Sequence, residues 1–119
     1  MMTGTIDNFR PHLRLYVKGA GGHGIFEFTI DTGYEGTLTL SEADCLALQL
    51  PFIKERDFQL ANGAPIKCNT YRLTVEWDGR EIDVQILALG EEPLLGAQIL
   101  DGYELCLNYS TNTLTLTEA

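Results

Sequence analysis

One carboxylate in this sequence has a setting suited to chemistry. Asp31 directly follows Phe28-Thr29-Ile30, the end of a mostly apolar strand-like run, and is itself followed by Thr32 and Gly33. A carboxylate held at the end of a buried strand can act toward water as a general base or acid. The same triplet can also be a plain turn, in which Asp accepts hydrogen bonds from backbone amides and Gly adopts a positive φ. The triplet alone leaves both readings open, so its surroundings must decide.

Three other segments supply that context. Two alternating runs joined by a glycine-rich stretch form a hairpin that leads into Asp31. About thirty residues later, the segment 58–67 predicts a second hairpin with Asn62-Gly63 near its tip. Further on, residues 93–96 (Pro-Leu-Leu-Gly) place two apolar residues and a glycine after another strand.

In this order the segments resemble retropepsin-like aspartic proteases, and the likeness covers about residues 13–109. It is closest to the prokaryotic single-domain members, in which an aromatic residue and then a glycine follow the triplet, as Tyr34 and Gly36 do here. The resemblance implies an all-β, barrel-like fold with the active site on a dimer axis. It also implies that Asp31 is the catalytic carboxylate.

The resemblance extends to the neighbours of Asp31. It makes Thr32 a hydrogen-bonding brace across the dimer axis, residues 62–63 the tip of a substrate-covering flap, and residues 94–96 an apolar loop packed beneath the Asp31 turn. The expected catalytic residues are Asp31, Thr32 and Gly33, and the expected substrate-binding residues are Tyr34, Ala61, Asn62 and Gly63.

Hydrolysis by this route needs two carboxylates around one water. One is ionised and takes a proton, while the other is protonated and polarises the peptide carbonyl. The chain of 119 residues has a single Asp-Thr-Gly, so a second Asp31 must come from a second copy through a two-fold contact. We therefore expect a homodimer, with residues 114–117 as a candidate unpaired edge for pairing across the interface. The alternative is a non-catalytic module of the same fold that binds a peptide or a partner strand.

The sequence departs from the retroviral pattern in three places. Retroviral members usually carry an acidic residue two positions after the triplet, paired with an Arg after the later glycine; here Glu35 is present, but Ala97 follows Gly96. Tyr34 replaces the usual Ala or Ser and is expected to narrow the cleft or wall a subsite. The expected flap, at residues 61–63, lacks the usual run of glycines.

No other acidic residue matches this setting. Glu91 and Glu92 lie beside Pro93 and predict a solvated turn, and Asp101-Gly102 predicts a turn that ends a short helix. The stretch 19–24 has the spacing G-x-G-x-x-G, but dinucleotide binding needs a helix after it. The residues that follow alternate as a strand, so a hairpin loop is predicted instead.

Two-residue alternation of apolar side chains predicts strands over most of the chain. Asp78-Gly79 predicts a tight hairpin turn. One helix is expected over 41–50, capped by Ser41, and a shorter helical turn over 97–100. Residues 1–119 are therefore expected to form one all-β domain with one or two short helices.

The composition indicates which classes of partner the protein can bind. The 17 acidic and 8 basic residues give a net charge of −9, which argues against nucleic acid and anionic membranes. The expected partner is a peptide or protein substrate. Cys45, Cys68 and Cys106 lie far apart, as do the two histidines, so neither a metal nor another cofactor is expected. The start of the sequence has no signal-like apolar stretch, and we expect a cytoplasmic location.

Overall fold

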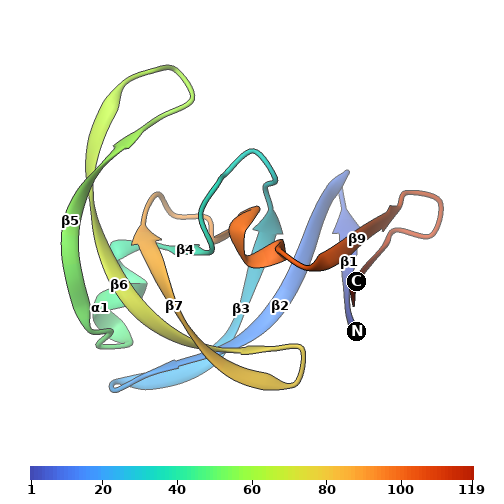
Figure 1. Cartoon of the computed structure of the whole chain (residues 1–119), viewed down its shortest axis with the longest axis horizontal. Coiled ribbons are helices and arrows are strands. Elements are labelled where there is room, and N and C mark those ends of the chain that lie inside the picture. Colours follow the sequence, from blue (N-terminus) through green and yellow to red (C-terminus); the bar gives the residue numbers. More distant parts are fainter.

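The computed structural model describes all 119 residues and is built mainly from strands (Figure 1). The elements are β1 (Met2–Asp7), β2 (Arg10–Gly19), β3 (Gly22–Ile30), β4 (Thr39–Leu40), α1 (Glu42–Ala47), β5 (Phe52–Gln59), β6 (Pro65–Trp77), β7 (Arg80–Ala88), β8 (Leu94–Leu95), the 3-10 helix η1 (Gln98–Leu100), β9 (Tyr103–Asn108) and β10 (Thr113–Glu118). The predicted all-β class with one or two short helices is confirmed. Neither helix is long and apolar enough to span a membrane.

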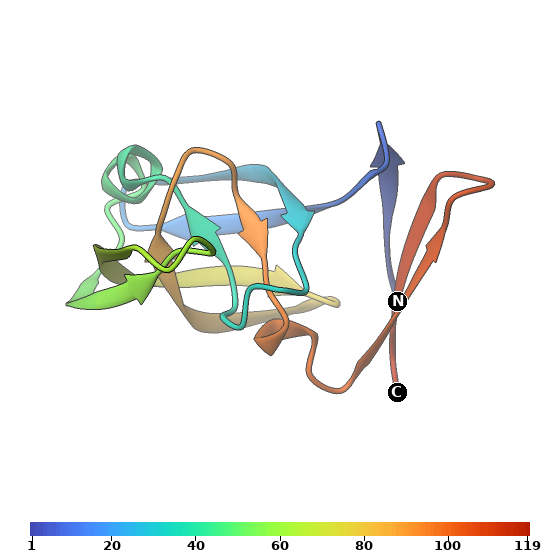
Figure 2. The same cartoon turned by 90° about the horizontal axis from the view of Figure 1, so that it is seen from above.

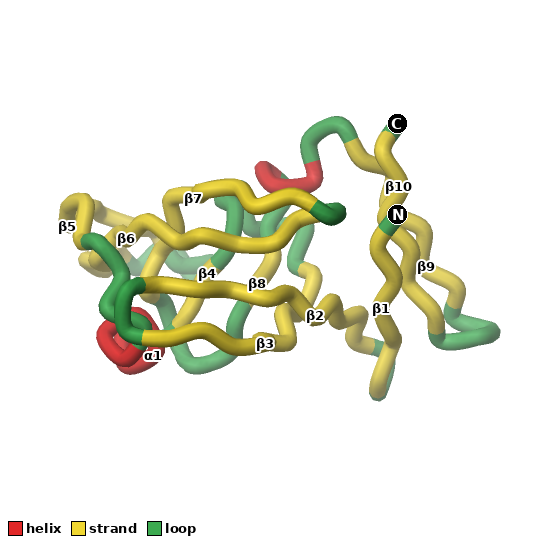
Figure 3. Tube along the Cα trace, turned by 90° about the horizontal axis from the view of Figure 1, so that it is seen from below, coloured by secondary structure: helices red, strands yellow, loops and turns green.

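The strands form one continuous, strongly bent sheet. Its main path runs β4-β7-β6-β2-β1-β10-β9, with β3 paired to β2 and β8, and β5 paired to β6. Neighbours are antiparallel except for two parallel pairs, β3 with β8 and β4 with β7. The strands β2 to β8 wrap around each other, whereas β1, β9 and β10 stand together to one side (Figures 2 and 3).

The core follows from the alternation of the strands. In β2, Leu13, Leu15 and Val17 are buried, while Arg14 between them is exposed. The register of β2 with β3 places Leu13 opposite Phe28, which is fully buried. One cluster of 20 buried residues continues from these strands through the centre of the chain. The hydrophobic effect of this burial stabilises the bent sheet.

The two predicted hairpins turn differently. Asp78 and Gly79 both have positive φ, 51° and 82°, as the predicted tight turn requires. In the second hairpin only Gly63 has a positive φ, 86°. Its tip is wider, because the Leu60 amide donates to the Ala64 carbonyl and the Gly63 amide donates to the Leu60 carbonyl.

The helix is shorter than predicted. Ser41 caps it by accepting a hydrogen bond from the Asp44 amide at 3.1 Å, but the α-helix ends at Ala47 rather than at residue 50. Gln49 has a φ of 51° and turns the chain away from the helical path. The 3-10 helix η1 occupies the second predicted helical turn.

The expectation that residues 114–117 form an unpaired edge is wrong. In register, β10 lies between β1 and β9, with Leu114 opposite both Gly4 and Leu107. Leu114 and Leu116 are fully buried and belong to the main core cluster. Because β10 pairs with β1 as well as with β9, it has no unpaired edge. The outer strand of this group is therefore β9.

Candidate active site

The end of β3 and the short strand β8 hold Asp31. Ile30 pairs with Leu95 in parallel, and the Asp31 amide donates to the Leu95 carbonyl at 2.9 Å. Beyond it the chain turns sharply: the Gly33 amide donates to Asp31 Oδ1 at 3.1 Å, and the Tyr34 amide donates to the Asp31 carbonyl at 3.1 Å. One backbone donor, the Gly33 amide, thus orients the half-buried carboxylate, and the other two bonds fix the Asp31 main chain.

The segment after β8 packs directly against this turn. The Gly96 amide donates to the Thr37 carbonyl and the Ala97 amide donates to the Tyr34 carbonyl, both at 2.7 Å. A Cβ at Gly96 would lie 2.3 Å from the Gly36 carbonyl oxygen, which is closer than real side chains come. Glycine is therefore required for the two segments to approach each other this closely.

The Tyr34 ring fills the space between two glycines. A Cβ at Gly36 would lie 2.2 Å from the Tyr34 hydroxyl oxygen, and one at Gly96 would lie 2.6 Å from Tyr34 Cδ2. The ring also meets Phe58 edge to face, with centroids 6.1 Å apart. Burial raises the pKa of Tyr34, and the positive charge of Arg56 opposes part of that rise. At neutral pH the phenol therefore keeps its proton.

A cleft of about 640 Å³ opens beside Asp31. One wall comes from the turn after β3, including Asp31, Gly33, Tyr34 and Glu35. The facing wall comes from the β5–β6 hairpin, including Arg56, Phe58, Gln59, Leu60 and Ala61. A groove between a carboxylate and a hairpin is suited to an extended peptide, which can offer both backbone groups and side chains.

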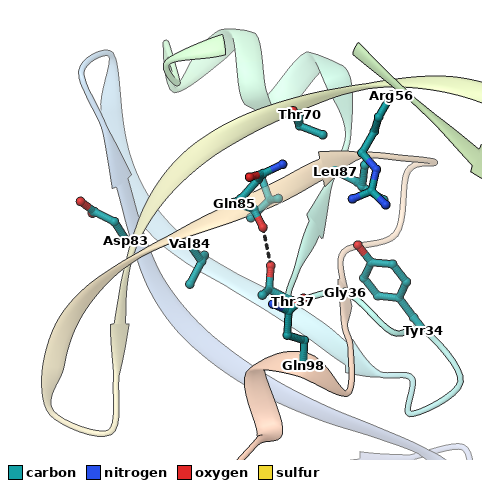
Figure 4. Close-up of a pocket in the computed structure, with 11 residues that line it drawn as sticks. Tyr34, Gly36, Thr37, Arg56, Thr70, Asp83, Val84, Gln85, Leu87 and Gln98 are labelled. Carbon is teal, nitrogen blue, oxygen red and sulfur yellow. Dashed lines mark hydrogen bonds between the residues drawn. The ribbon is translucent and has the colours of Figure 1, made fainter. Parts of the chain in front are cut away.

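A second cavity of about 400 Å³ adjoins the cleft (Figure 4). It is more polar and reaches toward Asp83 and Gln85 of β7. Tyr34 and Arg56 line both cavities and so stand where the two meet.

The structure brings four of the seven predicted site residues to the cleft: Asp31, Gly33, Tyr34 and Ala61. The other three lie outside its lining. Thr32 is exposed on the turn, and at the hairpin tip Asn62 accepts a hydrogen bond from the Ala64 amide, just before Gly63. The roles predicted for all seven remain predictions.

Sequence reasoning missed Arg56, Phe58 and Gln98 as cleft residues. A signal for the first two was present, because they are two positions apart on β5 and therefore share a face of the strand. Gln98 gave no such signal, since η1 places it only through the packing of β8 against the Asp31 turn.

Glu91 and Glu92 are exposed in a bend before β8, in line with the predicted solvated turn, and the Glu92 side chain also has partners within the chain. It accepts a hydrogen bond from the Thr29 hydroxyl at 2.6 Å and forms an ion pair with Arg10. The bond from Arg10 and then that from Thr29 lower the pKa of Glu92. The turn at Glu92 is thereby fastened to β3 two residues before Asp31.

No three His, Cys, Asp or Glu side chains lie together as a metal site would need. All three cysteines are free thiols; Cys45 and Cys68 are buried, and Cys106 is exposed on β9.

Solved structures share this architecture. The protease of EIAV, in a complex with the inhibitor HBY-793, superposes with a TM-score of 0.57 and 18% sequence identity, over 77% of this chain and 86% of the other. A retropepsin-like aspartic protease from Rickettsia conorii superposes with a TM-score of 0.56 and 14% identity, over 95% of this chain and 86% of the other. No family sequence model and no curated protein sequence matches the chain. The chain has the retropepsin-like fold.

Proposed function

We propose that two copies of this chain form one aspartic endopeptidase, in which the two Asp31 carboxylates activate a single water. One observation carries the proposal: a backbone-held carboxylate, on the Asp-Thr-Gly turn of a retropepsin-like fold, lines a cleft bounded by a hairpin. The residues of one chain supply one such carboxylate. The proposed reaction needs two, and a two-fold axis beside the turn supplies the second.

The proposed mechanism divides two tasks between chemically identical groups. Two carboxylates brought close together repel each other, so one retains a proton while the other is ionised. The ionised carboxylate takes a proton from the water as the water attacks the peptide carbonyl, and the protonated one donates to the carbonyl oxygen. The bond from the Gly33 amide keeps Asp31 Oδ1 oriented, so little reorganisation is needed during the reaction.

The test replaces Asp31 with Asn, which keeps size and polarity but removes both the base and the acid. Cleavage of an unfolded protein or a peptide library should fall by several orders of magnitude, while the melting temperature stays the same or rises. Asp101→Asn is the matched control, because Asp101 is exposed and outside the cleft. It should leave the cleavage rate unchanged.

A peptide mimic with a hydroxyl in place of the scissile carbonyl adds a readout that does not depend on turnover. It should raise the melting temperature of the wild type far more than the matching peptide does, since a working dyad binds the tetrahedral geometry best. A non-catalytic binding module would show no preference for the hydroxyl and no cleavage by either protein. Unfolding of Asp31→Asn would instead identify Asp31 as a structural turn cap.

A further inference from the structure

We propose that the cleft contains a subsite for a carboxylate of the peptide, formed by the Arg56 guanidinium and the Tyr34 hydroxyl. This inference rests on the proposed function, because it assigns the class of substrate at that site. The protein would then favour peptides with an acidic residue close to the bond that is cut. The carboxylate can come from an acidic side chain or from the free C-terminus of the peptide, and peptides with blocked and free ends separate these two sources.

Arg56 is the only cation in either cavity. Ion pairs within the chain engage Arg10, Arg14, Lys18, Lys67 and Arg80. The basic side chains without such a pair are Lys54, Arg56 and Arg72. Of these, Arg56 alone lines a cavity, and it lines both.

This lack of a partner is informative in so acidic a protein. The net charge is −9, and five of the eight Lys and Arg side chains lie within ion-pair distance of a carboxylate. Glu35 lines the same cleft, yet it forms no ion pair with Arg56. The guanidinium therefore remains free to bind a carboxylate that comes from outside the chain.

Tyr34 supplies a second donor at the same place. Its hydroxyl points toward the side of the cavity where the Arg56 head group lies (Figure 4). No hydrogen bond within the chain engages that hydroxyl, and its raised pKa keeps it protonated and able to donate. Phe58 and the two flanking glycines hold the ring, so the donor is already oriented before a ligand arrives.

The pair of donors matches a carboxylate in geometry and charge. A guanidinium can donate two parallel hydrogen bonds to the two oxygens of a carboxylate, and charged hydrogen bonds of this kind are stronger than neutral ones. Arg56 is exposed, so solvent screens part of the attraction. We expect a preference of about tenfold for a carboxylate over the matching amide at low salt.

The experiment uses peptides with acetylated and amidated ends, so that one glutamate is the only carboxylate. The glutamate is moved along the peptide, and each peptide is compared with its glutamine twin by kcat/KM on the dimer. At one position the wild type should prefer glutamate about tenfold, and added salt should reduce that preference. A peptide with glutamine in place of every glutamate and a free C-terminus tests whether the subsite binds the C-terminal carboxylate instead.

Four variants test whether Arg56 and Tyr34 cause the preference. Arg56→Gln should abolish it, and Arg56→Glu should reverse it in favour of lysine peptides. Lys54→Gln removes the same charge from the same strand but lies outside both cavities, so it should retain the glutamate preference. Tyr34→Phe keeps the ring and should lose part of the preference.

Binding of the same peptides to Asp31→Asn, measured by fluorescence anisotropy, separates this proposal from the proposed function. Binding that depends on glutamate and Arg56 supports the subsite even if no protein cleaves any peptide. Cleavage that is indifferent to charge at every position and at the C-terminus overturns the subsite and leaves the protease intact. A preference that survives in Arg56→Gln overturns it as well.

Discussion

The Tyr34 ring and its two glycine neighbours determine the shape of the candidate site. A large ring occupies position 34, where the retroviral pattern has a small residue. The missing Cβ atoms of Gly36 and Gly96 make room for the ring. The three residues therefore form one packing unit, and substitutions within it should not be independent.

Gly36→Ala should destabilise the protein by about 1–3 kcal/mol, because the new methyl group overlaps the Tyr34 phenol. In a Tyr34→Ser background, Gly36→Ala should lower the free energy of unfolding much less, since the overlapping ring atoms are absent. Urea unfolding of the four proteins measures this coupling.

Gly96→Ala is the contrasting variant. Its methyl group would also meet the backbone oxygens of Gly36 and Tyr34, at 2.3 and 2.7 Å. A smaller side chain at position 34 does not remove those atoms, so the cost should persist in both backgrounds. Equal rescue of both glycine variants would contradict this account of the packing.

Individual residues were predictable only where their signal was local. The sequence predicted Asp31 as the central carboxylate because the apolar run, the acid and the turn glycine are consecutive. Arg56 was not predicted because it lies among other charged residues on β5, such as Glu55 and Asp57. Its two-residue spacing from Phe58 places both on one face of β5, but the sequence does not say that this face lines the cleft.

Among the secondary-structure elements, β3 depends on a contact from outside its own hairpin. Glu92, in the loop before β8, accepts a hydrogen bond from the Thr29 hydroxyl and forms an ion pair with Arg10 at the start of β2. One carboxylate thus connects three segments beneath the Asp31 turn.

Glu92→Gln should make the free energy of unfolding depend less strongly on pH in the acid range. The pKa of Glu92 is lowered in the folded state, so its stabilisation is present above the unfolded value of about 4.3 and is lost as the pH falls through the folded value. Near pH 6 the free energy of unfolding of the wild type should exceed that of the variant by no more than about 1 kcal/mol, because Glu92 is partly exposed and solvent screens its interactions.

Urea unfolding between pH 3 and pH 7 checks this expectation. The two curves should converge toward the acid end of that range. Parallel curves would show that the carboxylate carries no such stabilisation, whatever its hydrogen bonds.

The strands themselves were predictable where one face is buried. Runs such as β2, β6 and β7 alternate clearly because they face the core. Most of β5 was missed, since nearly all of its residues are exposed and no alternation marks it. The two-residue strands β4 and β8 are too short for any periodicity and exist only through their parallel partners.

At the scale of the whole molecule, the proposed dimer can be tested most directly at Thr32. This residue is exposed in the single chain, so a larger side chain there does not disturb the monomer. If the turn lies on a two-fold axis, Thr32→Arg brings two positive charges together in the interface. Like charges so placed cost several kcal/mol, so the dimer dissociation constant should rise by about 100-fold or more.

Sedimentation over a range of concentrations measures that constant. Ala43→Arg is the control: position 43 is exposed on α1, which lies away from the Asp31 turn (Figure 1). A wild type that stays monomeric at hundreds of micromolar would contradict the homodimer, and so would a Thr32→Arg protein that dimerises like the wild type.

The arrangement of the strands in the sheet was beyond the sequence. Local alternation reports that a strand has a buried face, but not which strand lies beside it. The pairing of β1 with β10 joins the two ends of the chain and turned the expected edge into an internal strand. Only the folded chain shows that β9 is the outer strand.

The parallel pairing of β3 with β8 also sets an order of assembly. The Asp31 amide bonds to a carbonyl about sixty residues further along the chain, and Gly96 and Ala97 close the turn from the same distant segment. Hairpins such as β2–β3 join near neighbours, whereas this contact must first close a long loop, which is slower. During synthesis on the ribosome, Asp31 emerges long before the residues that support it. A chain that has not yet reached residues 94–97 therefore has no assembled hydrolytic site, and the proposed protease acquires one only after that segment has been made.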